Sequence, residues 1–309
     1  MKKYKILLAG GGTGGHSMPI IAVAREIKKL YQQENLKLHY IGPKDAATFD
    51  IFFTENIKTH AIFSGKIRNY FSVMNFIDLI FNIPLGFIQS FFLLLFIRPR
   101  IIFSKGGTGA LPVTYAARIL GIGVFIHESD ASAGKSNQIA AAWAKKIFTS
   151  FLTTKLLPIA NVTCVGNPIR KEILEGNRDA AKAAFNLTFQ KPIILFLGGS
   201  QGAEAINNFI FLALNNLLKD YEVIHVTGPK NFKKASDDAR AVLDKNLEPY
   251  YHIVSSLDEI ALKNAYAATD AIVSRAGAGS IFEIAALGKP SILVPLPTSA
   301  RNHQVENAY

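Results

Sequence analysis

The fold of this chain is decided by the stretch Ile6-Leu7-Leu8-Ala9-Gly10-Gly11-Gly12-Thr13-Gly14-Gly15-His16. The apolar residues at its start predict a short buried strand, and the glycines that follow predict a tight turn. A helical pattern covers residues 20–30. A strand, a glycine turn and a helix in this order are typical of a βαβ unit with a parallel sheet.

The second half of the chain repeats this order. The apolar run 193–197 leads into the glycine-rich segment 198–202, and a helical pattern starts at about Ala203. Further strands are predicted at 37–41, 101–104, 123–127, 223–227, 271–274 and 291–294. The segment Val165-Gly166-Asn167-Pro168 interrupts the pattern and predicts a linker. We therefore expect two α/β domains, 1–165 and 166–309, each a doubly wound Rossmann-like sheet, facing each other across a cleft.

Four glycine-rich turns follow predicted strands, at 10–15, 106–109, 198–202 and 277–279. Such a turn brings backbone N–H groups and the positive end of a helix to one place, which suits a phosphate. Gly10, Gly12 and Gly15 also have the dinucleotide-binding spacing. That fingerprint needs an acidic residue at the end of the second strand, and residues 38–43, LHYIGP, contain none. An NAD site is therefore disfavoured.

Composition limits the partners. The net charge of +11 over 309 residues indicates an anionic partner, either nucleic acid, anionic lipid or a phosphorylated substrate. Because the sequence has no nucleic-acid-binding motif, no nucleic acid is expected. The single cysteine, Cys164, excludes an internal disulfide and is expected to be a small core residue. The apolar run 6–9 is too short for a secretion signal, so we expect a cytoplasmic chain.

Five motifs recur along the chain in a particular order and spacing. They are GGTGGH at 11–16, GGTG at 106–109, HE at 127–128, GGSQGA at 198–203 and SRAGA at 274–278. Together they resemble the MurG family, UDP-N-acetylglucosamine transferases that act on lipid I and have the GT-B fold. The resemblance spans the whole chain. It implies lipid II as the product for peptidoglycan synthesis, UDP-N-acetylglucosamine and undecaprenyl-linked lipid I as partners, and no cofactor.

The resemblance further implies an N-terminal acceptor- and membrane-binding domain and a C-terminal UDP-sugar domain. In the latter, Glu283 would accept hydrogen bonds from both ribose hydroxyls, while Ser200 and Arg170 would hold the diphosphate. Asn137 and Gln304 would contact the sugar, and Leu257 the uracil. The implied substrate-binding set is completed by Thr13, Gly14 and Gly15 and by Ala278, Gly279, Ser280, Ile281 and Phe282, whose backbone would line the sugar. Family members usually continue beyond this point, so we expect either a fragment or a short member.

The implied reaction inverts the anomeric centre, because an α-linked sugar nucleotide becomes a β-1,4 glycoside. A base should remove the acceptor's proton. His16 is the first candidate, as base or acceptor-positioning group; alternatively it only hydrogen-bonds locally at a helix start. Glu128 is the second, as base or hydroxyl-orienting group; alternatively it orders a loop. No Asp-x-Asp pair is present, so no metal is expected.

Residues 76–97 form an unusually apolar stretch that nearly reaches the length needed to span a bilayer. Polar residues interrupt it, and it lies between two predicted strands, where a crossover helix belongs. We expect a partly buried helix with an exposed apolar face, against the alternatives of a wholly buried core helix and a spanning helix. The flanking cations are Lys66, Arg68, Arg98 and Arg100. They predict peripheral binding to anionic lipid at the cytoplasmic face of the inner membrane.

Two other classes of function stay open. A UDP-N-acetylglucosamine 2-epimerase would have the same fold and would release UDP without an acceptor. A non-catalytic lipid-binding relative would bind membranes but not the UDP-sugar, and the presence of Arg170, Ser200, Glu283 and Gln304 argues against it.

Overall fold

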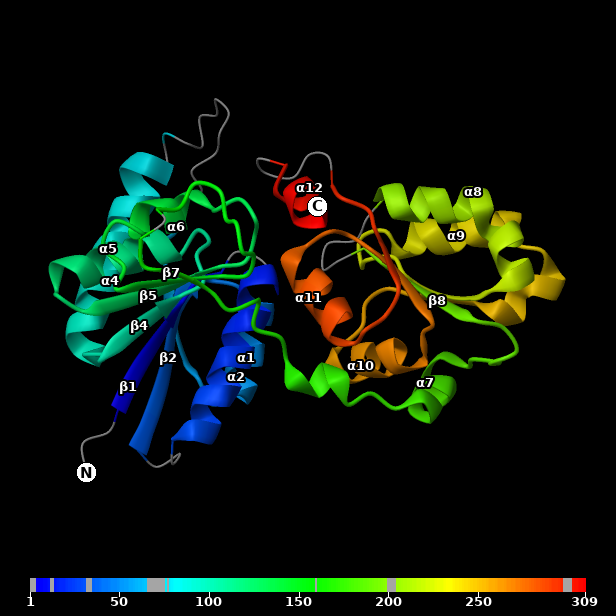
Figure 1. Cartoon of the computed structure of the whole chain (residues 1–309), viewed down its shortest axis with the longest axis horizontal. Coiled ribbons are helices and arrows are strands. Elements are labelled where there is room, and N and C mark those ends of the chain that lie inside the picture. The colour runs from blue at the N-terminus through cyan, green and yellow to red at the C-terminus, as the bar shows by residue number, and fades with distance from the viewer. Residues whose placement is uncertain are drawn as a thin grey trace. The chain divides into compact units, whose positions relative to one another are not determined.

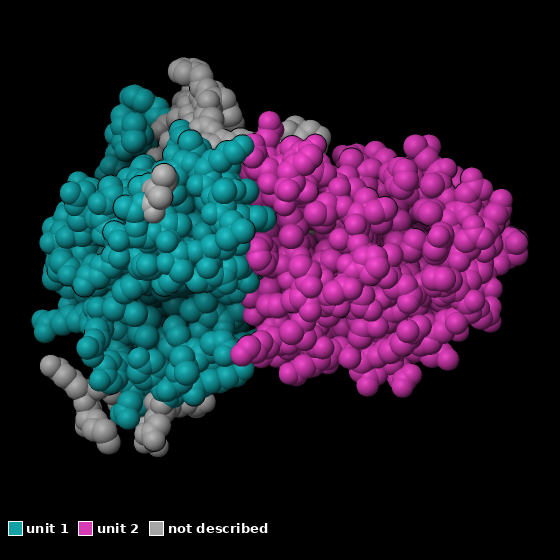
Figure 2. All heavy atoms as spheres, in the orientation of Figure 1, with its two compact units in different colours: residues 1–168 teal, residues 169–309 magenta. Residues whose placement is uncertain are grey.

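The computed structural model describes residues 4–11, 14–31, 35–65, 76, 78–158, 160–198, 204–296 and 302–309. The chain divides into two compact units, Met1–Pro168 and Ile169–Tyr309 (Figure 2). This division lies at the end of the segment 165–168 that the sequence singled out as a linker, whereas the expected boundary was between 165 and 166.

The first unit is built on a parallel sheet of seven strands in the order β3-β2-β1-β4-β5-β6-β7 (Figure 1). The strands are β1 (Tyr4–Ala9), β2 (Leu36–Pro43), β3 (Lys58–Ile62), β4 (Ile101–Ser104), β5 (Gly123–Glu128), β6 (Lys146–Thr149) and β7 (Val162–Cys164). The helices are α1 (Gly14–Leu30), α2 (Ala46–Thr54), the π-helical turn η2 (Asp78–Asn82), α4 (Ile83–Ile97), α5 (Ala110–Ile119) and α6 (Lys135–Ala140).

Each face of this sheet has its own apolar core. Leu8 and Tyr40 pack with Ile20 of α1 and Phe52 of α2 on one face. Leu7 and its neighbours pack with α4 and α5 on the other face. Successive strand residues point to opposite faces, so a strand covered on both sides must be apolar at every position. The unbroken apolar run at 6–9 is therefore the signature of a central strand.

The second unit contains a parallel sheet of five strands in the order β10-β9-β8-β11-β12. The strands are β8 (Ile193–Leu197), β9 (Glu222–Val226), β10 (Tyr251–Val254), β11 (Ala271–Ser274) and β12 (Ser291–Leu293). The helices are η3 (Lys171–Leu174), α7 (Arg178–Phe185), α8 (Glu204–Asp220), α9 (Phe232–Val242), η4 (Lys245–Tyr250), α10 (Glu259–Ala268), α11 (Ala278–Ala286) and α12 (His303–Ala308). In Figure 1, α8 and α9 cover one face of this sheet and α7 and α10 the other.

Strand order reverses once in each sheet, and these two points locate the glycine turns. In the first unit the reversal lies between β1 and β4, which lead into the turns at 10–15 and 106–109. In the second unit it lies between β8 and β11, which lead into the turns at 198–202 and 277–279. Ligands of open parallel sheets bind at such a reversal, beyond the carboxyl ends of the strands. All four turns thus belong to two ligand-binding positions of the fold.

The predicted strands are all present, with ends that differ by two residues at most, and four strands were missed. These are β3, β6, β7 and β10, with the sequences KTHAI, KIFT, VTC and YHIV. Three of them are edge strands of their sheets. An edge strand needs little apolar surface, so its sequence carries a weak pattern. The expectation of a buried Cys164 was wrong, because this residue ends the edge strand β7 and is exposed.

The apolar stretch forms η2 and α4, which connect β3 to β4. Within the stretch, Asp78 is buried and accepts a hydrogen bond of 2.7 Å from Asn82 Nδ2. Leu94 and Ile97 belong to the core, whereas Phe92 and Phe96 are 61% and 89% exposed. The helix is therefore partly buried with an exposed apolar face, and the wholly buried alternative is wrong. Residues Asp78–Ile97 are also long and apolar enough to cross a membrane by composition alone.

Candidate functional site

The two glycine turns of the first unit are held against each other. A Cβ on Gly107 would lie 2.1 Å from the carbonyl oxygen of Gly11, and both glycines have positive φ. The Tyr40 hydroxyl of β2 donates a hydrogen bond of 2.8 Å to the carbonyl oxygen of Gly10 and so holds the start of the first turn against the sheet. No residue other than glycine fits where the backbones approach this closely. The described residues of the two turns, Gly10, Gly11, Gly106 and Gly107, therefore form a closely packed rim at the strand reversal.

His16 lies on this rim. It belongs to the first turn of α1 and is half-buried, and a Cβ on Gly107 would lie 3.3 Å from its Cδ2 atom. Gly14 and Gly15 begin the same helix. Thr13, which was expected to bind substrate, lies outside the described residues. The structure thus brings the first candidate base next to both glycine turns of the unit.

Glu128, the second candidate, is buried at the end of β5 and already has three donors. Its carboxylate accepts hydrogen bonds from the backbone N–H groups of Asp130 (3.0 Å) and Gly134 (2.9 Å) and from Asn137 Nδ2 (2.9 Å). Burial, followed by the nearby Asp130, raises the pKa of Glu128, and the three hydrogen bonds oppose this. This geometry is that of the loop-ordering alternative, in which the carboxylate shapes residues 128–137.

Asn137 connects this loop to the second glycine turn. Its amide would lie 2.9–3.1 Å from a Cβ on Gly106, so the turn and the side chain fit only because Gly106 has none. Its Nδ2 donates to Glu128, and its buried Oδ1 has no hydrogen-bond partner among the described residues. The expected contact of Asn137 with the sugar remains a prediction.

A buried lysine that the sequence did not predict as part of the site lies between β4 and the second glycine turn. Lys105 is 1% exposed, and its ammonium donates to His127 Nδ1 (2.6 Å), to Asn167 Oδ1 (3.1 Å) and to Ser129 Oγ. Three acceptors match the three N–H groups of an ammonium. His127 Nε2 in turn donates to the Gly166 carbonyl oxygen at 2.9 Å. Lys105 thereby ties the ends of two strands to the last residues of the first unit.

Burial lowers the pKa of Lys105 from 10.5 to about 7, although the nearby Glu128 and Asp130 act to raise it. Burial and then the Lys105 charge lower the pKa of His127 to about 3, so this imidazole is neutral at physiological pH. The available signal was a lysine in Ser104-Lys105-Gly106, where a buried strand leads directly into a glycine turn. Lysine is almost never fully buried without partners.

In the second unit Arg170 and Glu283, both expected to bind the UDP-sugar, contact each other. Arg170 is buried; its Nη2 lies 3.0 Å from Glu283 Oε1, and its Nη1 lies 3.1 Å from Glu259 Oε2. The Tyr266 hydroxyl donates to Glu283 Oε2 at 3.3 Å. Burial, then the Glu283 charge, raises the pKa of Tyr266 well above its usual value, so the hydroxyl remains a donor. Tyr266 and Glu259 were not expected in this site.

The start of α11 is uncrowded among the described residues. A Cβ on Gly277 or Gly279 would meet no described atom within 4 Å, unlike one on Gly106 or Gly107 of the first unit. Ala278 is buried, whereas residues 279–282 of the same turn are partly accessible. Unpaired N–H groups at an accessible helix start can bind an anion or a sugar oxygen. Ser200, which was expected to hold the diphosphate, lies outside the described residues.

The remaining expected residues of the second unit are Leu257 and Gln304. Leu257 is partly buried, just before Asp258, whose side chain caps α10 by accepting from Ala261 N at 2.7 Å. Gln304 lies on α12, and its Oε1 accepts from Leu296 N at 2.8 Å. Asn307 of the same helix donates to the Ala276 carbonyl oxygen at 3.2 Å. This bond brings α12 to the glycine turn of α11 and places Gln304 close to it.

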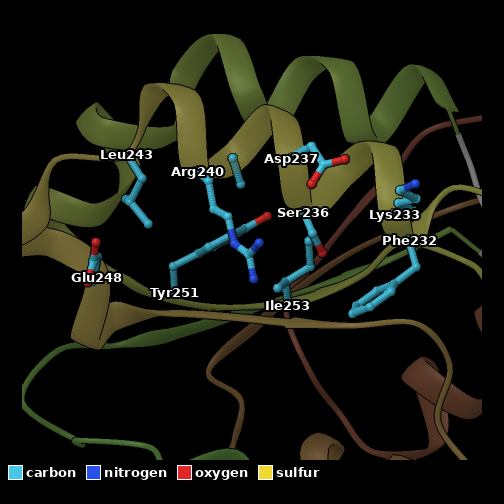
Figure 3. A pocket seen from close by; sticks show the side chains of 10 residues that line it. Phe232, Lys233, Ser236, Asp237, Arg240, Leu243, Glu248, Tyr251 and Ile253 are labelled. Atoms are coloured by element: carbon cyan, nitrogen blue, oxygen red, sulfur yellow. The ribbon is translucent and has the colours of Figure 1, made fainter.

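A groove of about 890 Å³ lies elsewhere in the second unit, between α9 and the edge strand β10 (Figure 3). Arg240 reaches from α9 toward Tyr251 of β10. None of the residues expected in the site lines this groove. Because ligands of parallel sheets bind at the strand reversal rather than at a sheet edge, we place the functional site at the glycine turns.

Replacing Lys105 with methionine should change how stability depends on pH. Between pH 7 and 10.5 the native state, with its lowered lysine pKa, binds fewer protons than the unfolded chain, so the free energy of unfolding should rise with pH in this range. Lys105→Met should lose this part of the rise. Urea unfolding at several pH values would measure it, with the exposed Lys219→Met as the matched control. An unchanged slope in Lys105→Met would contradict the pKa shift.

Comparison with known proteins identifies the family. The glycosyltransferase family 28 N-terminal domain matches residues 6–149, and the family 28 C-terminal domain matches residues 193–309. The UDP-N-acetylglucosamine–N-acetylmuramyl-(pentapeptide) pyrophosphoryl-undecaprenol N-acetylglucosamine transferase of Clostridium kluyveri is 36% identical, over 98% of this chain and 82% of that protein. The protein with the same name from Clostridium novyi is 37% identical, over 100% of this chain and 83% of that protein.

Solved structures agree with this relationship. The crystal structure of Acinetobacter baumannii MurG has a TM-score of 0.72 at 26% identity, covering 99% of this chain and 82% of that one. A UDP-GlcNAc 2-epimerase from Neisseria meningitidis has a TM-score of 0.67 at 15% identity, covering 98% of this chain and 90% of that one, which shows a shared fold alone. The chain belongs to glycosyltransferase family 28 and, within it, to the MurG family of N-acetylglucosamine transferases.

Proposed function

We propose that this chain transfers N-acetylglucosamine from UDP-N-acetylglucosamine to the 4-hydroxyl of N-acetylmuramic acid in lipid I, making lipid II. The observation that carries the proposal is the extent of the relationship. Relatives named for this transfer align with 98–100% of this chain and are 36–37% identical to it over the aligned residues. The two strand reversals supply the two binding positions that a donor and an acceptor require.

The donor binds at the second unit in this proposal. Glu283 accepts hydrogen bonds from the ribose hydroxyls, and the accessible start of α11 at 278–282 contacts the diphosphate and the sugar through backbone groups. Leu257 contacts the uracil, and Gln304 the sugar hydroxyls. Ser200 is expected to bind the diphosphate. Arg170 is expected to do the same; each of its terminal nitrogens donates one hydrogen bond to a carboxylate, of Glu259 or Glu283, and keeps a second N–H group.

The acceptor binds at the first unit, beside His16, Gly14 and Gly15. The acceptor oxygen forms a bond to the anomeric carbon from the side opposite UDP, while the bond from that carbon to the UDP oxygen breaks. The hydroxyl proton passes to a base, for which His16 is our candidate, and the electron pair leaves with UDP. Backbone N–H groups at the glycine turns stabilise the charge that grows on the diphosphate. Asn137, which lies next to Gly106, is expected to contact the sugar.

Incorporation of labelled N-acetylglucosamine from UDP-N-acetylglucosamine into lipid I tests the proposal directly. Labelled lipid II is the expected product. Release of UDP in the absence of lipid I, with epimerised sugar as the product, would instead identify a 2-epimerase. Binding to lipid without binding of UDP would identify a non-catalytic relative.

His16→Ala should separate catalysis from donor binding. If His16 is the base, kcat should fall by about 100-fold or more, while the Kd for UDP, measured by calorimetry, should stay unchanged. The donor site lies in the other unit, which is why the substitution should not affect it. An effect confined to the KM for the donor would show that His16 contributes to ground-state binding and not to proton transfer.

Glu283→Gln should weaken UDP binding while preserving the size of the side chain. Hydrogen bonds to a charged group contribute about 1.5–3 kcal/mol, so we expect the Kd to rise by roughly 10- to 100-fold. Calorimetry with UDP alone measures this without any acceptor. Unchanged affinity in a folded variant would remove Glu283 from the donor site.

We also propose that the exposed face of η2 and α4 docks on anionic membrane at the cytoplasmic side. The exposed apolar side chains of this face are Leu79, Ile80, Phe81, Leu85, Ile88, Phe92, Leu95 and Phe96. Arg98 and Arg100 lie exposed at the end of α4, whereas Lys66 and Arg68 lie outside the described residues. Apolar side chains beside cations match the interfacial region of an anionic bilayer. The buried Asp78 and the packing of Leu94 and Ile97 favour docking over a spanning helix.

Liposome flotation should show binding that rises with anionic lipid and falls, incompletely, in high salt. Each Lys or Arg near an anionic surface contributes about 1 kcal/mol to the binding free energy, and salt screens this contribution. Insertion of apolar side chains adds a contribution that salt does not remove. The double substitution Arg98→Glu and Arg100→Glu should weaken binding. Lys219→Glu with Lys233→Glu, which changes the charge equally on exposed lysines of the second unit, is the matched control. Retention of the membrane-bound protein after a carbonate wash would favour a spanning helix instead.

A further inference from the structure

The Glu283 carboxylate is held on both oxygens. Arg170 Nη2 lies 3.0 Å from Oε1, and the Tyr266 hydroxyl donates to Oε2 at 3.3 Å. The two donors come from separate segments, since Arg170 directly precedes η3 whereas Tyr266 belongs to α10. Rotation of the carboxylate would therefore break at least one of the two interactions.

The interactions form a closed circuit. Arg170 is itself held by Glu259, which lies on α10, the helix that also carries Tyr266. The path thus runs from Glu259 to Arg170, from Arg170 to Glu283 on α11, and from Glu283 back to α10 through Tyr266. Because the circuit begins and ends on one helix, it fixes α11 against α10 as well as the carboxylate itself. Tyr266 is 1% exposed and cannot reach solvent or a ligand.

The circuit leaves part of the carboxylate available. Each carboxylate oxygen has two lone pairs, and each oxygen of Glu283 uses one of them for a protein donor. The side chain of Glu283 remains 12% exposed, more than that of Arg170 at 9%. Two neighbouring hydroxyls can therefore each donate one hydrogen bond, one to either oxygen, without displacing a protein donor. This is the arrangement of the 2′- and 3′-hydroxyls of a ribose.

We infer that Tyr266, together with the Arg170–Glu259 pair, is a positioning residue that orients Glu283 toward the two ribose hydroxyls and so makes the donor site selective for ribonucleotides over 2′-deoxyribonucleotides. The inference rests on the proposed role of Glu283 in binding the ribose. A carboxylate that rotates freely can bind either hydroxyl in several orientations. One that is fixed on both sides loses a well-placed hydrogen bond when the 2′-hydroxyl is missing.

The test is the ratio of the Kd of 2′-deoxy-UDP to the Kd of UDP, measured by calorimetry. We expect a ratio of about 10 or more in the unsubstituted chain, since the missing hydroxyl leaves a charged acceptor short of a donor. Tyr266→Phe removes only the hydroxyl and should lower the ratio by about 2- to 10-fold, as expected for one ordinary hydrogen bond. Glu259→Gln, at the more exposed end of the circuit, should lower it in the same direction and serves if Tyr266→Phe does not fold.

Tyr251→Phe is the matched control. Tyr251 also lies in the second unit, and its hydroxyl bonds to the buried His225 Nδ1 at 2.8 Å. Its loss should reduce thermal stability and leave the ratio unchanged. A purely structural role of Tyr266 would give the same result as this control.

The outcomes separate the two proposals. If Glu283→Gln lowers the ratio but neither Tyr266→Phe nor Glu259→Gln does, the positioning role is overturned and the ribose role stands. If Glu283→Gln leaves the ratio unchanged, the ribose role fails and the inference fails with it. A lower ratio in Glu283→Gln, Tyr266→Phe and Glu259→Gln, with Tyr251→Phe unchanged, supports both.

Discussion

The close approach of the Gly11 carbonyl to Gly107 is the constraint on which the first unit depends. A Cβ on Gly107 would overlap that oxygen, so the two turns can meet only as bare backbone. Their meeting has a cause in the topology, because β1 and β4 are neighbours at the point where strand order reverses. Side chains are thereby excluded from the centre of the rim and placed around it, where His16 and Asn137 lie. The fold thus creates a binding position before any particular side chain defines its chemistry.

Each unit contains a network of polar side chains next to a glycine turn, and the two networks are built around groups of opposite charge. In the first unit the polar groups behind the rim surround Lys105, whose ammonium form is hydrogen-bonded to neutral acceptors. In the second unit they surround an anion, Glu283, which is paired with Arg170 and Tyr266. A buried charge is costly unless it is bonded on all sides, and such bonds also fix its direction. Each charge therefore rigidifies the structure next to a glycine turn, and only Glu283 remains accessible enough to contact a ligand directly.

The sequence predicted the central strands and the glycine turns well, for a physical reason. Strands covered on both faces are apolar throughout, as at 193–197, and turns without room for a Cβ must be glycine. Edge strands such as β7 lack the first signal, which is why Cys164 was wrongly expected in the core. Partners across the fold, such as Glu259 for Arg170, give no local signal at all. Such residues are far apart in sequence and meet only when the unit is folded, and hydrophobic periodicity carries no information about which of them will meet.

The helix α4 illustrates how composition alone leaves a structural question undecided. A crossover helix needs one apolar face, and α4 provides it through Leu94 and Ile97 against the sheet. The rest of its circumference is apolar as well, and this excess has no use within the unit, since Phe92 and Phe96 are exposed. Large exposed apolar patches on a folded protein indicate a contact with a partner or a membrane. Docking of this face on a membrane, as proposed above, would give the excess apolar surface a use while the opposite side of the helix packs in the core, and it would agree with an acceptor that is attached to a lipid.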